Sequence, residues 1–165
     1  MDKMVSSQLE LVNTTCFNIT IDAWAKQGSP ENAEAIIRQM QAMYEENDDD
    51  RLRPNEVSFN SAIHACAKSG NPRKAQFLLQ QMYELGYEPS PETFSAVMNA
   101  MIQEEHPGLK IQAFLDALEE KYANGENQSA PEKVHYLMAI QAWGRTKDFG
   151  GDPSPGRAED LLPVN

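Results

Sequence analysis

The residues best able to do chemistry in this sequence are its histidines and acidic clusters, and their spacing predicts no catalysis. The histidines share no spacing with a cysteine or carboxylate that suits a metal site or a catalytic triad; they are His64, His106 and His135. The acidic run from Asp48 to Asp50 lacks the spacing of a calcium-binding loop. No glycine-rich phosphate-binding loop occurs. We therefore predict no enzyme activity, no metal site and no cofactor.

The two cysteines, Cys16 and Cys66, are too few for a disulfide framework or a zinc site. Both lie beside or within apolar helical patterns. A cysteine in such a place usually packs as a small apolar side chain. We therefore expect two buried thiols with a structural role.

The charge balance narrows the choice of partners. Lysine and arginine number 14 and aspartate and glutamate 25, so the net charge is −11 at pH 7. Such an excess of negative charge opposes strong non-specific binding to nucleic acid. No apolar run reaches the roughly 18 residues of a membrane-spanning helix. The segment MDKMVSSQLELVN, residues 1–13, has the features of neither a signal peptide nor a transit peptide.

The same pattern of residues occurs several times along the chain. Residues 17–40, FNITIDAWAKQGSPENAEAIIRQM, align with residues 59–82 at an offset of 42. The aromatic residue that opens the pattern recurs after a further 35 residues and again after 42, as Phe94 and Tyr136. The basic period is therefore 35, lengthened twice by 7. We expect the first insertion, with the acidic run Glu45 to Asp50, to be a solvated loop, and the second to lie in residues 121–132.

Each unit has the pattern of two helices joined by a short turn. Apolar residues recur at helical spacing in both halves, and a glycine followed closely by a proline, as at Gly70 and Pro72, separates them. One such hairpin cannot bury both of its faces, so neighbouring hairpins must stack. We predict an all-α, right-handed solenoid of stacked antiparallel helix hairpins. Its units would be residues 14–55, 56–90, 91–132 and an incomplete 133–165, with residues 1–13 ending a preceding unit.

The first helices of the units should lie parallel along one face, over residues 15–27, 56–69, 91–104 and 132–144. Their opening aromatics should occupy equivalent buried places; these are Phe17, Phe59, Phe94 and Tyr136. Nine residues after each aromatic stand Lys26, Lys68, Gln103 and Arg145. The three basic residues could form a stripe on the first-helix face, or they could be solvated residues at helix ends, where positive charge is favourable.

Several motifs together resemble one family of repeat proteins. They are the period of 35, the aromatic–Asn opening, Ala-x-Ala-Lys-x-Gly in the first helix, an alanine and a late methionine in the second, and a proline before the next unit. In these features the chain resembles the pentatricopeptide repeat family. Tetratricopeptide arrays have a period of about 34 and different signature residues.

The resemblance implies binding of single-stranded RNA at one base per repeat, with two base-reading residues in each unit. One follows the opening aromatic and the other follows the closing proline, which gives Asn18 with Asn55, Asn60 with Ser90, and Ser95 with Glu132. By the same resemblance, base-wedging residues would be Thr15, Val57 and Val134, and contacts to the RNA backbone would come from Lys26, Lys68 and Arg145. Units three and four depart from the pattern at Glu92, Glu132 and Leu137.

The resemblance also implies a role in RNA processing, stability or translation in a mitochondrion or chloroplast. The alternative is a tetratricopeptide-like scaffold whose acidic concave face holds a partner helix or peptide. The two hypotheses differ in what lines the face of the first helices. RNA binding requires basic residues on the face that carries Asn18 and Asn60, whereas the scaffold hypothesis requires acidic ones. Neither hypothesis involves a membrane.

Overall fold

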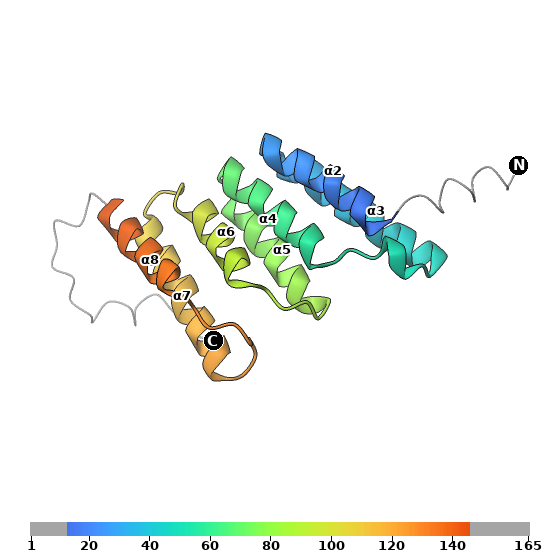
Figure 1. The fold of residues 1–165 in the computed structure, drawn as a ribbon. Helices are drawn as coiled ribbons and strands as arrows, with labels where there is room; N and C mark the ends of the chain where they lie inside the picture. The colour runs from blue at the N-terminus through green and yellow to red at the C-terminus, as the bar shows by residue number, and fades with distance from the viewer. Residues whose placement is uncertain (1–12, 146–165) are drawn as a thin grey trace, which may run out of the picture.

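A computed structural model of the chain describes residues 13–145, and Figure 1 shows how their helices are arranged. This part of the chain contains seven α-helices and one short 3-10 helix, and it contains no strand. The elements are α2 (Thr14–Gln27), α3 (Pro30–Asn47), η1 (Asp50–Leu52), α4 (Glu56–Ser69), α5 (Pro72–Glu84), α6 (Pro91–Met101), α7 (Pro107–Ala123) and α8 (Lys133–Arg145). The predicted all-α class is confirmed.

The helices alternate between two layers. The first helices α2, α4 and α6 lie side by side, with extensive contacts between α2 and α4 and between α4 and α6 (Figure 1). The second helix α3 packs against α2 and α4, and α5 packs against α4 and α6, so each bridges two successive first helices. In the second layer an ion pair between Lys74 Nζ and Glu34 Oε2, 2.6 Å apart, joins α5 to α3. The hairpins therefore stack into a solenoid, as predicted.

The turns inside the first two hairpins depend on a left-handed glycine and a capping residue. Gly28 and Gly70, which follow α2 and α4, have φ angles of 66° and 63°. Glycine adopts such angles without the steric cost that a Cβ brings. After Gly70, the side chain of Asn71 accepts a hydrogen bond from the backbone N–H of Lys74. Pro72 begins α5, at a position where a missing N–H costs nothing.

Three of the four opening aromatics are buried, and the fourth is not. Phe17, Phe59 and Phe94 are 9%, 0% and 0% exposed. Tyr136 is 41% exposed, and its hydroxyl donates to Glu119 Oε1 at 2.7 Å. The prediction that Tyr136 is buried is therefore wrong. In units one and two the second helix packs closely on the first, whereas the residues that follow α8 lie outside the described part of the chain.

The insertion in unit one is largely helical, although its acidic run is exposed to solvent, as expected, except at the half-buried Asp49. Helix α3 continues to Asn47 and so includes the start of the acidic run. Asp49 then caps η1, because its carboxylate accepts from the backbone N–H of Arg51 at 3.0 Å. Leu52, the last residue of η1, is fully buried. The expected loop is therefore wrong for the backbone, which is helical up to Asn47 and again over Asp50–Leu52, where Leu52 packs in the core.

Unit three departs from the geometry of the first two. Helix α6 ends at Met101, short of the predicted end at residue 104. Its partner α7 packs mainly against α8 and only lightly against α6. The segment after α7 returns to the second layer, where Asn127 is 2% exposed and its Oδ1 accepts from the Tyr83 hydroxyl at 2.9 Å. The insertion of this unit is therefore a loop that packs against α5.

The two cysteines have different environments. Cys66 is fully buried in α4, and this burial raises the pKa of its thiol to about 12. Cys16 is exposed on α2, at the N-terminal end of the described solenoid. The prediction of two buried thiols is therefore wrong for Cys16, which no helix of an earlier unit covers among the described residues.

Gly70→Ala should destabilise the protein more than Gly86→Ala does. Both glycines have positive φ angles, 63° and 75°, so a Cβ costs about 1 kcal/mol at either place. At Gly70 the Cβ would also lie 2.6 Å from Gln103 Oε1, and moving Gln103 would break its 2.8 Å hydrogen bond to Ala67 O. We expect Gly70→Ala to lower the free energy of unfolding by about 1 kcal/mol more.

Urea denaturation, monitored by circular dichroism, measures the free energy of unfolding of both variants. Gly86→Ala is the matched control, because nothing lies within 4 Å of a Cβ built at Gly86. Equal denaturation midpoints for the two variants would show that the contact between Gly70 and Gln103 contributes no stability.

Only one of the two thiols should react quickly in the folded protein at pH 8. With a pKa of about 12, roughly 10⁻⁴ of Cys66 is thiolate at that pH, and the side chain is fully buried. An aromatic disulfide reagent should therefore titrate one thiol before denaturant is added and two afterwards. Cys16→Ser should remove the fast phase. Two fast equivalents in the native protein would contradict the buried position of Cys66.

Candidate nucleic-acid interface

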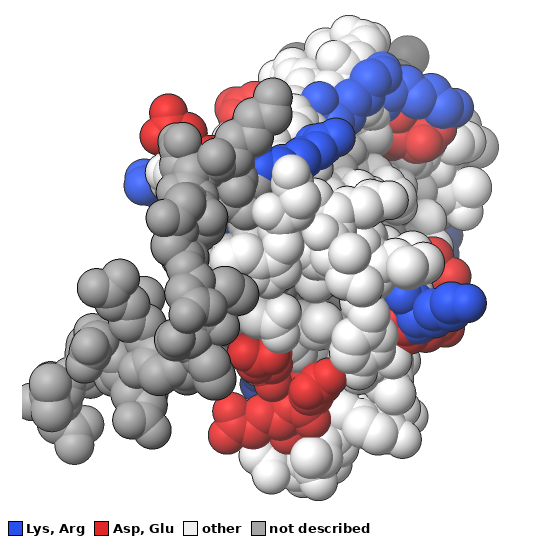
Figure 2. All heavy atoms as spheres, turned by 90° about the vertical axis from the view of Figure 1, so that its left-hand side faces the viewer, with Lys and Arg blue, Asp and Glu red and all other residues white. Residues whose placement is uncertain are grey.

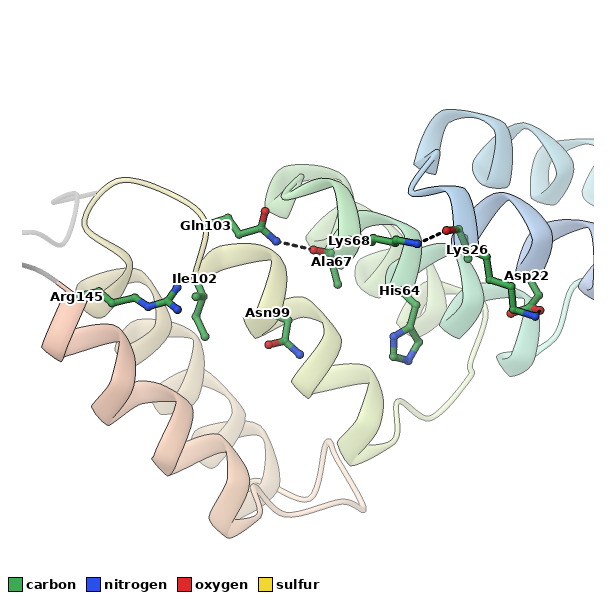
Figure 3. Close-up of a pocket in the computed structure, with 10 residues that line it drawn as sticks. Asp22, Lys26, His64, Ala67, Lys68, Asn99, Ile102, Gln103 and Arg145 are labelled. Carbon is green, nitrogen blue, oxygen red and sulfur yellow. Dashed lines mark hydrogen bonds and ion pairs between the residues drawn. The ribbon is translucent and has the colours of Figure 1, made fainter.

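A groove of about 600 Å³ crosses the C-terminal halves of the first helices (Figure 3). The four residues that stand nine positions after the opening aromatics all line it: Lys26, Lys68, Gln103 and Arg145. They come from α2, from α4, from the segment that follows α6 and from α8. The structure thus brings together the residues that the sequence places at equivalent positions.

Positive charge predominates in this groove. Lys26, Lys68 and Arg145 are all exposed. Asp22 is the one acidic residue among those that line the groove, and its Oδ2 lies 2.7 Å from Lys26 Nζ. Figure 2, which views the molecule from the α8 side, shows basic side chains in a band across the top, with acidic side chains both beside this band and lower down. Basic residues, rather than acidic ones, therefore line the groove of the first helices.

Two of these residues also hold neighbouring units together. The ammonium of Lys68 donates to the backbone carbonyl of Lys26, at the end of α2 (Figure 3). The amide of Gln103 makes the corresponding contact one unit further on, to Ala67 O at 2.8 Å. Such donors satisfy carbonyls that have no partner within their own helix. Lys68 therefore stabilises a helix end, which is the second role that the sequence analysis considered for the basic residues.

The predicted reading residues lie on the same side of the first helices as the groove, nearer the N-termini. Asn60 precedes the groove residues His64 and Ala67 by four and seven positions, a spacing that puts all three on one side of α4. Asn18 in α2 and Ser95 in α6 stand in the same relation to the groove residues of their helices. All three reading side chains are half-buried, so each has an atom available to a ligand.

In unit one the two predicted reading residues contact each other. Asn18 Nδ2 donates to Asn55 Oδ1 at 3.2 Å. Ser58 joins both, because its hydroxyl donates to Asn18 Oδ1 at 2.6 Å and its backbone N–H donates to Asn55 Oδ1 at 3.2 Å. Asn55 is the N-cap of α4. The pair therefore forms part of the start of the next first helix.

In unit two the predicted pair is linked through a third residue, Thr93. Its hydroxyl donates to Asn60 Oδ1 at 2.6 Å and lies 3.2 Å from Ser90 Oγ. Ser90 caps α6 in the way that Asn55 caps α4. The structure therefore brings Asn60 and Ser90 to one junction without direct contact.

In unit three His135 takes the linking place. Its Nε2 lies 3.0 Å from Ser95 Oγ, and its Nδ1 accepts from the backbone N–H of Glu132 at 2.8 Å. His135 is fully buried, whereas the side chain of Glu132 is exposed. The third junction therefore also links its two predicted positions through one residue, but it does so with an imidazole and a backbone N–H.

Sequence analysis does not single out these linking residues. Each is the third residue of a first helix, and they are Ser58, Thr93 and His135. A polar residue three positions after an N-cap is the capping-box pattern, and α4 and α6 both have complete boxes. That spacing was the signal in the sequence, although it does not reveal the bond to the preceding unit.

The predicted wedge positions are open to solvent. Thr15 is exposed, and Val57 and Val134 are 55% and 43% exposed. Unit three has Glu92 at this position. A hydrogen bond from the backbone N–H of Glu92, together with one from the Ser90 hydroxyl, holds the pKa of its carboxyl below the usual range. Unit three therefore places an ionised carboxylate where unit two has an apolar side chain.

Within residues 13–145 no group of three or more histidine, cysteine, aspartate or glutamate side chains is placed to hold a metal ion. None of the helices in that range combines the length and the apolarity needed to cross a membrane. The groups offered by the first-helix face are the amides and hydroxyls of the junctions and the cations of the groove.

Comparisons with known proteins agree with the repeat pattern. Residues 15–44 match the PPR repeat, and residues 54–103 match the PPR repeat family, where PPR stands for pentatricopeptide repeat. Among solved structures, the pentatricopeptide repeat protein PPR10 from maize matches with a TM-score of 0.63 and 21% sequence identity. That match covers 79% of this chain and 17% of the maize chain. The comparison with curated proteins gives no match.

The two matched segments include α2 and α4 to α6, the helices whose turns, buried aromatics and junctions repeat most regularly. The likeness to the maize protein adds that the helices stack as in a solved solenoid of the same repeat. Repeat pattern, hairpin geometry and family matches therefore agree, and the chain is a pentatricopeptide repeat protein with a few repeats.

Proposed function

We propose that the chain binds single-stranded RNA along the face of α2, α4, α6 and α8, at one base per repeat. The observation that carries the proposal is a hydrogen-bonding side chain at each of three successive unit junctions, beside a groove lined by basic residues. Amides and hydroxyls can donate to and accept from base edges. Lysine and arginine neutralise phosphates and release counterions. The proposed units are residues 14–55, 56–90, 91–132 and 133 onward.

In this arrangement the phosphates follow the groove and the bases turn toward the junctions. Lys26, Lys68 and Arg145 meet the backbone. The reading side chains lie four to seven residues earlier than groove residues of the same helices, which is about 6–10 Å along the helix axis. That separation is comparable with the reach of a nucleotide from its phosphate to its base edge.

The units should differ in how well they select a base. Units one and two present only amides and a hydroxyl at the reading positions. Unit three adds the exposed carboxylates of Glu92 and Glu132, which repel phosphate. Unit four has Leu137, 47% exposed, which cannot form a hydrogen bond through its side chain. We therefore assign base selection to units one and two.

The cellular role that follows from the proposal is RNA processing, stability or translation in a mitochondrion or chloroplast, in line with the family resemblance. The affinity of these few units should be weak, since the chain has a net charge of −11 and few cations face the ligand. Binding by such a surface should also respond strongly to salt.

A protein partner is the second candidate ligand, and a different groove favours it. This groove lies between α5 and α7, measures about 520 Å³, and combines Met101 and Phe114 with Arg73 and with Lys110, which is paired with Glu104 at 2.7 Å. An amphipathic helix with an apolar stripe and acidic flanks would suit that lining. Binding there would not depend on the groove of the first helices, so variants of the latter separate the two functions.

Affinity for single-stranded RNA should fall with salt in a way that depends on the first-helix groove. Three basic contacts predict a slope of about −2 in a plot of log affinity against log salt. Lys26→Gln combined with Arg145→Gln should weaken binding and reduce the slope to about −0.7. Fluorescence anisotropy of a labelled pyrimidine-rich oligonucleotide over a salt series measures both.

The matched control removes the same charge from the second layer, with Lys110→Gln and Lys121→Gln in α7. We expect it to leave the slope unchanged. An equal loss in both double variants would mean that net charge, and not the groove, governs binding. A flat salt response of the unmodified chain would contradict RNA binding and favour the protein partner.

Glu92→Gln should strengthen RNA binding by a few-fold at low salt, and the gain should shrink as salt rises. The reason is that the Glu92 carboxyl is negatively charged at neutral pH, as an exposed glutamate ordinarily is, and lies beside the proposed path of the RNA; the hydrogen bonds that lower its pKa favour the charged form further. Glu120→Gln, which removes an exposed carboxylate from α7, is the control. The same gain in both variants would contradict the proposed path.

A further inference from the structure

We propose that Ser58, Thr93 and His135 are positioning residues that fix the reading side chain of the preceding unit as a hydrogen-bond donor. Each belongs to the start of one first helix and contacts the reading residue of the helix before it. The inference rests on the proposed RNA-binding function and adds to it the residues that set how a base edge is read.

In unit one the orientation of the Asn18 amide follows from a backbone N–H group, which can donate a hydrogen bond but cannot accept one. The backbone N–H of Ser58 donates to Asn55 at 3.2 Å, so the receiving atom of Asn55 is its carbonyl oxygen. The Asn18 atom that faces this oxygen at 3.2 Å must then be the nitrogen Nδ2. The helix start therefore dictates which end of the Asn18 amide points toward Asn55.

The hydroxyl of Ser58 gives the same orientation a second time. It accepts from the backbone N–H of Asn55 at 3.1 Å, so its own hydrogen is free to donate. The nearest acceptor is Asn18 Oδ1 at 2.6 Å, closer than Asn55 Oδ1 at 3.2 Å. One of the two lone pairs of the Asn18 oxygen is thereby engaged at the junction, and the Asn18 nitrogen has one more N–H to offer a ligand.

Unit two repeats this arrangement with different residues. The backbone N–H groups of Ser90 and Thr93 donate to each other's hydroxyl oxygens, at 3.1 Å and 3.3 Å. The Thr93 hydroxyl donates to Asn60 Oδ1 at 2.6 Å. One lone pair of Asn60 Oδ1 is therefore engaged at the junction, and the NH₂ group of this partly exposed residue can donate to a ligand.

Unit three reaches the same result with an imidazole. His135 Nδ1 accepts from the backbone N–H of Glu132 at 2.8 Å, so the ring hydrogen is on Nε2. Nε2 lies 3.0 Å from both Ser95 Oγ and Pro91 O. The single Nε2–H is shared between these two oxygens, so Ser95 Oγ receives part of one hydrogen bond and its own hydrogen can donate elsewhere.

The bond to the preceding unit is not a requirement of the helix cap. A capping box needs only the two reciprocal bonds between the N-cap and the third residue, and both exist in α4 and α6. The additional bond across the junction occurs three times with three residue types. Its shared effect in units one and two is that the oxygen of the reading amide faces the junction and the amide nitrogen keeps an N–H for the ligand.

A reading amide that is held as a donor selects for an acceptor at one place on the base edge, such as the O2 carbonyl of a pyrimidine, where adenine has a C–H group. An amide released from this bond can turn by about 180° and accept instead, because its two ends have nearly the same shape. In unit two the Thr93 hydroxyl orients Asn60, so its loss should lower base discrimination more than it lowers overall binding. In unit one the bond from Asn18 Nδ2 to Asn55 Oδ1 remains after loss of the Ser58 hydroxyl, so the effect there should be smaller.

The test compares the full chain with single-stranded U, C and A homo-oligonucleotides, whose uniform sequences make the binding register irrelevant. The unmodified chain should prefer the pyrimidine oligonucleotides. Ser58→Ala combined with Thr93→Val should reduce the ratio of pyrimidine to A affinity by about tenfold. Ser58→Thr combined with Thr93→Ser retains both hydroxyls and should keep the ratio.

Two further measurements separate positioning from a structural role. A merely structural defect would weaken binding to all oligonucleotides together and leave their ratio unchanged. Ser61→Ala, a hydroxyl deletion elsewhere in α4, should have no effect on the ratio. In the absence of RNA, the side-chain NH₂ resonances of Asn18 and Asn60 should shift in the double alanine–valine variant and stay in place in Ser61→Ala.

An unchanged ratio in the folded double variant would overturn the inference and leave RNA binding intact. Failure of the unmodified chain to bind any of the oligonucleotides would overturn the proposed function and the reading role with it. Circular dichroism establishes folding. If the double variant unfolds, Thr93→Val alone, which keeps the shape of the side chain, gives the same comparison for unit two.

Discussion

Every first helix of this solenoid begins with backbone N–H groups that have no partner within the helix, and the way in which they are satisfied organises the rest. In α4 and α6 a side chain at the N-cap accepts from the third residue, and the third residue accepts from the N-cap in return. These reciprocal capping bonds form close to the preceding first helix. The donor and acceptor atoms that the capping residues do not use can therefore bond to that helix. Asn18 and Asn60 each accept one hydrogen bond from a hydroxyl of the next first helix. The candidate site is therefore a consequence of helix capping in a stacked array.

Close packing of the first helices is what lets these short side chains reach across. Residues at the contacts of α4 and α6 are small and fully or almost fully buried, among them Ala62, Ala65, Ala96 and Ala100. Small residues allow helix backbones to approach, and a hydroxyl spans the remaining distance. The same closeness lets Lys68 and Gln103 bond to carbonyls at the end of the helix before them. Junctions at both ends of the helices thus align the reading positions with the basic groove.

The parts of this structure that depend on local pattern could be predicted from the sequence. Period, turn glycines and apolar spacing indicate the hairpins, the burial of Phe59 and the alignment of Lys26 with Lys68. The early end of α6 could not be predicted, since the residues after Met101 include good helix formers and no glycine or proline before Pro107. The bond from Ser58 to Asn18 joins residues 40 positions apart, so it depends on how closely two helices approach, which a single-sequence pattern does not contain.

The third junction shows how geometry and chemistry change together. Helix α6 packs much less against α8 than α4 packs against α6, so a hydroxyl at the third position of α8 would have a wider gap to cross. His135 stands there instead, and its longer ring reaches both Ser95 Oγ and Pro91 O at 3.0 Å. The ring also packs edge-on against Phe94, with centroids 6.2 Å apart. His135 therefore packs against the opening aromatic of the preceding unit while it bonds to Ser95. One residue thus keeps the hydrogen-bond pattern of the junctions where the spacing of the helices no longer supports it.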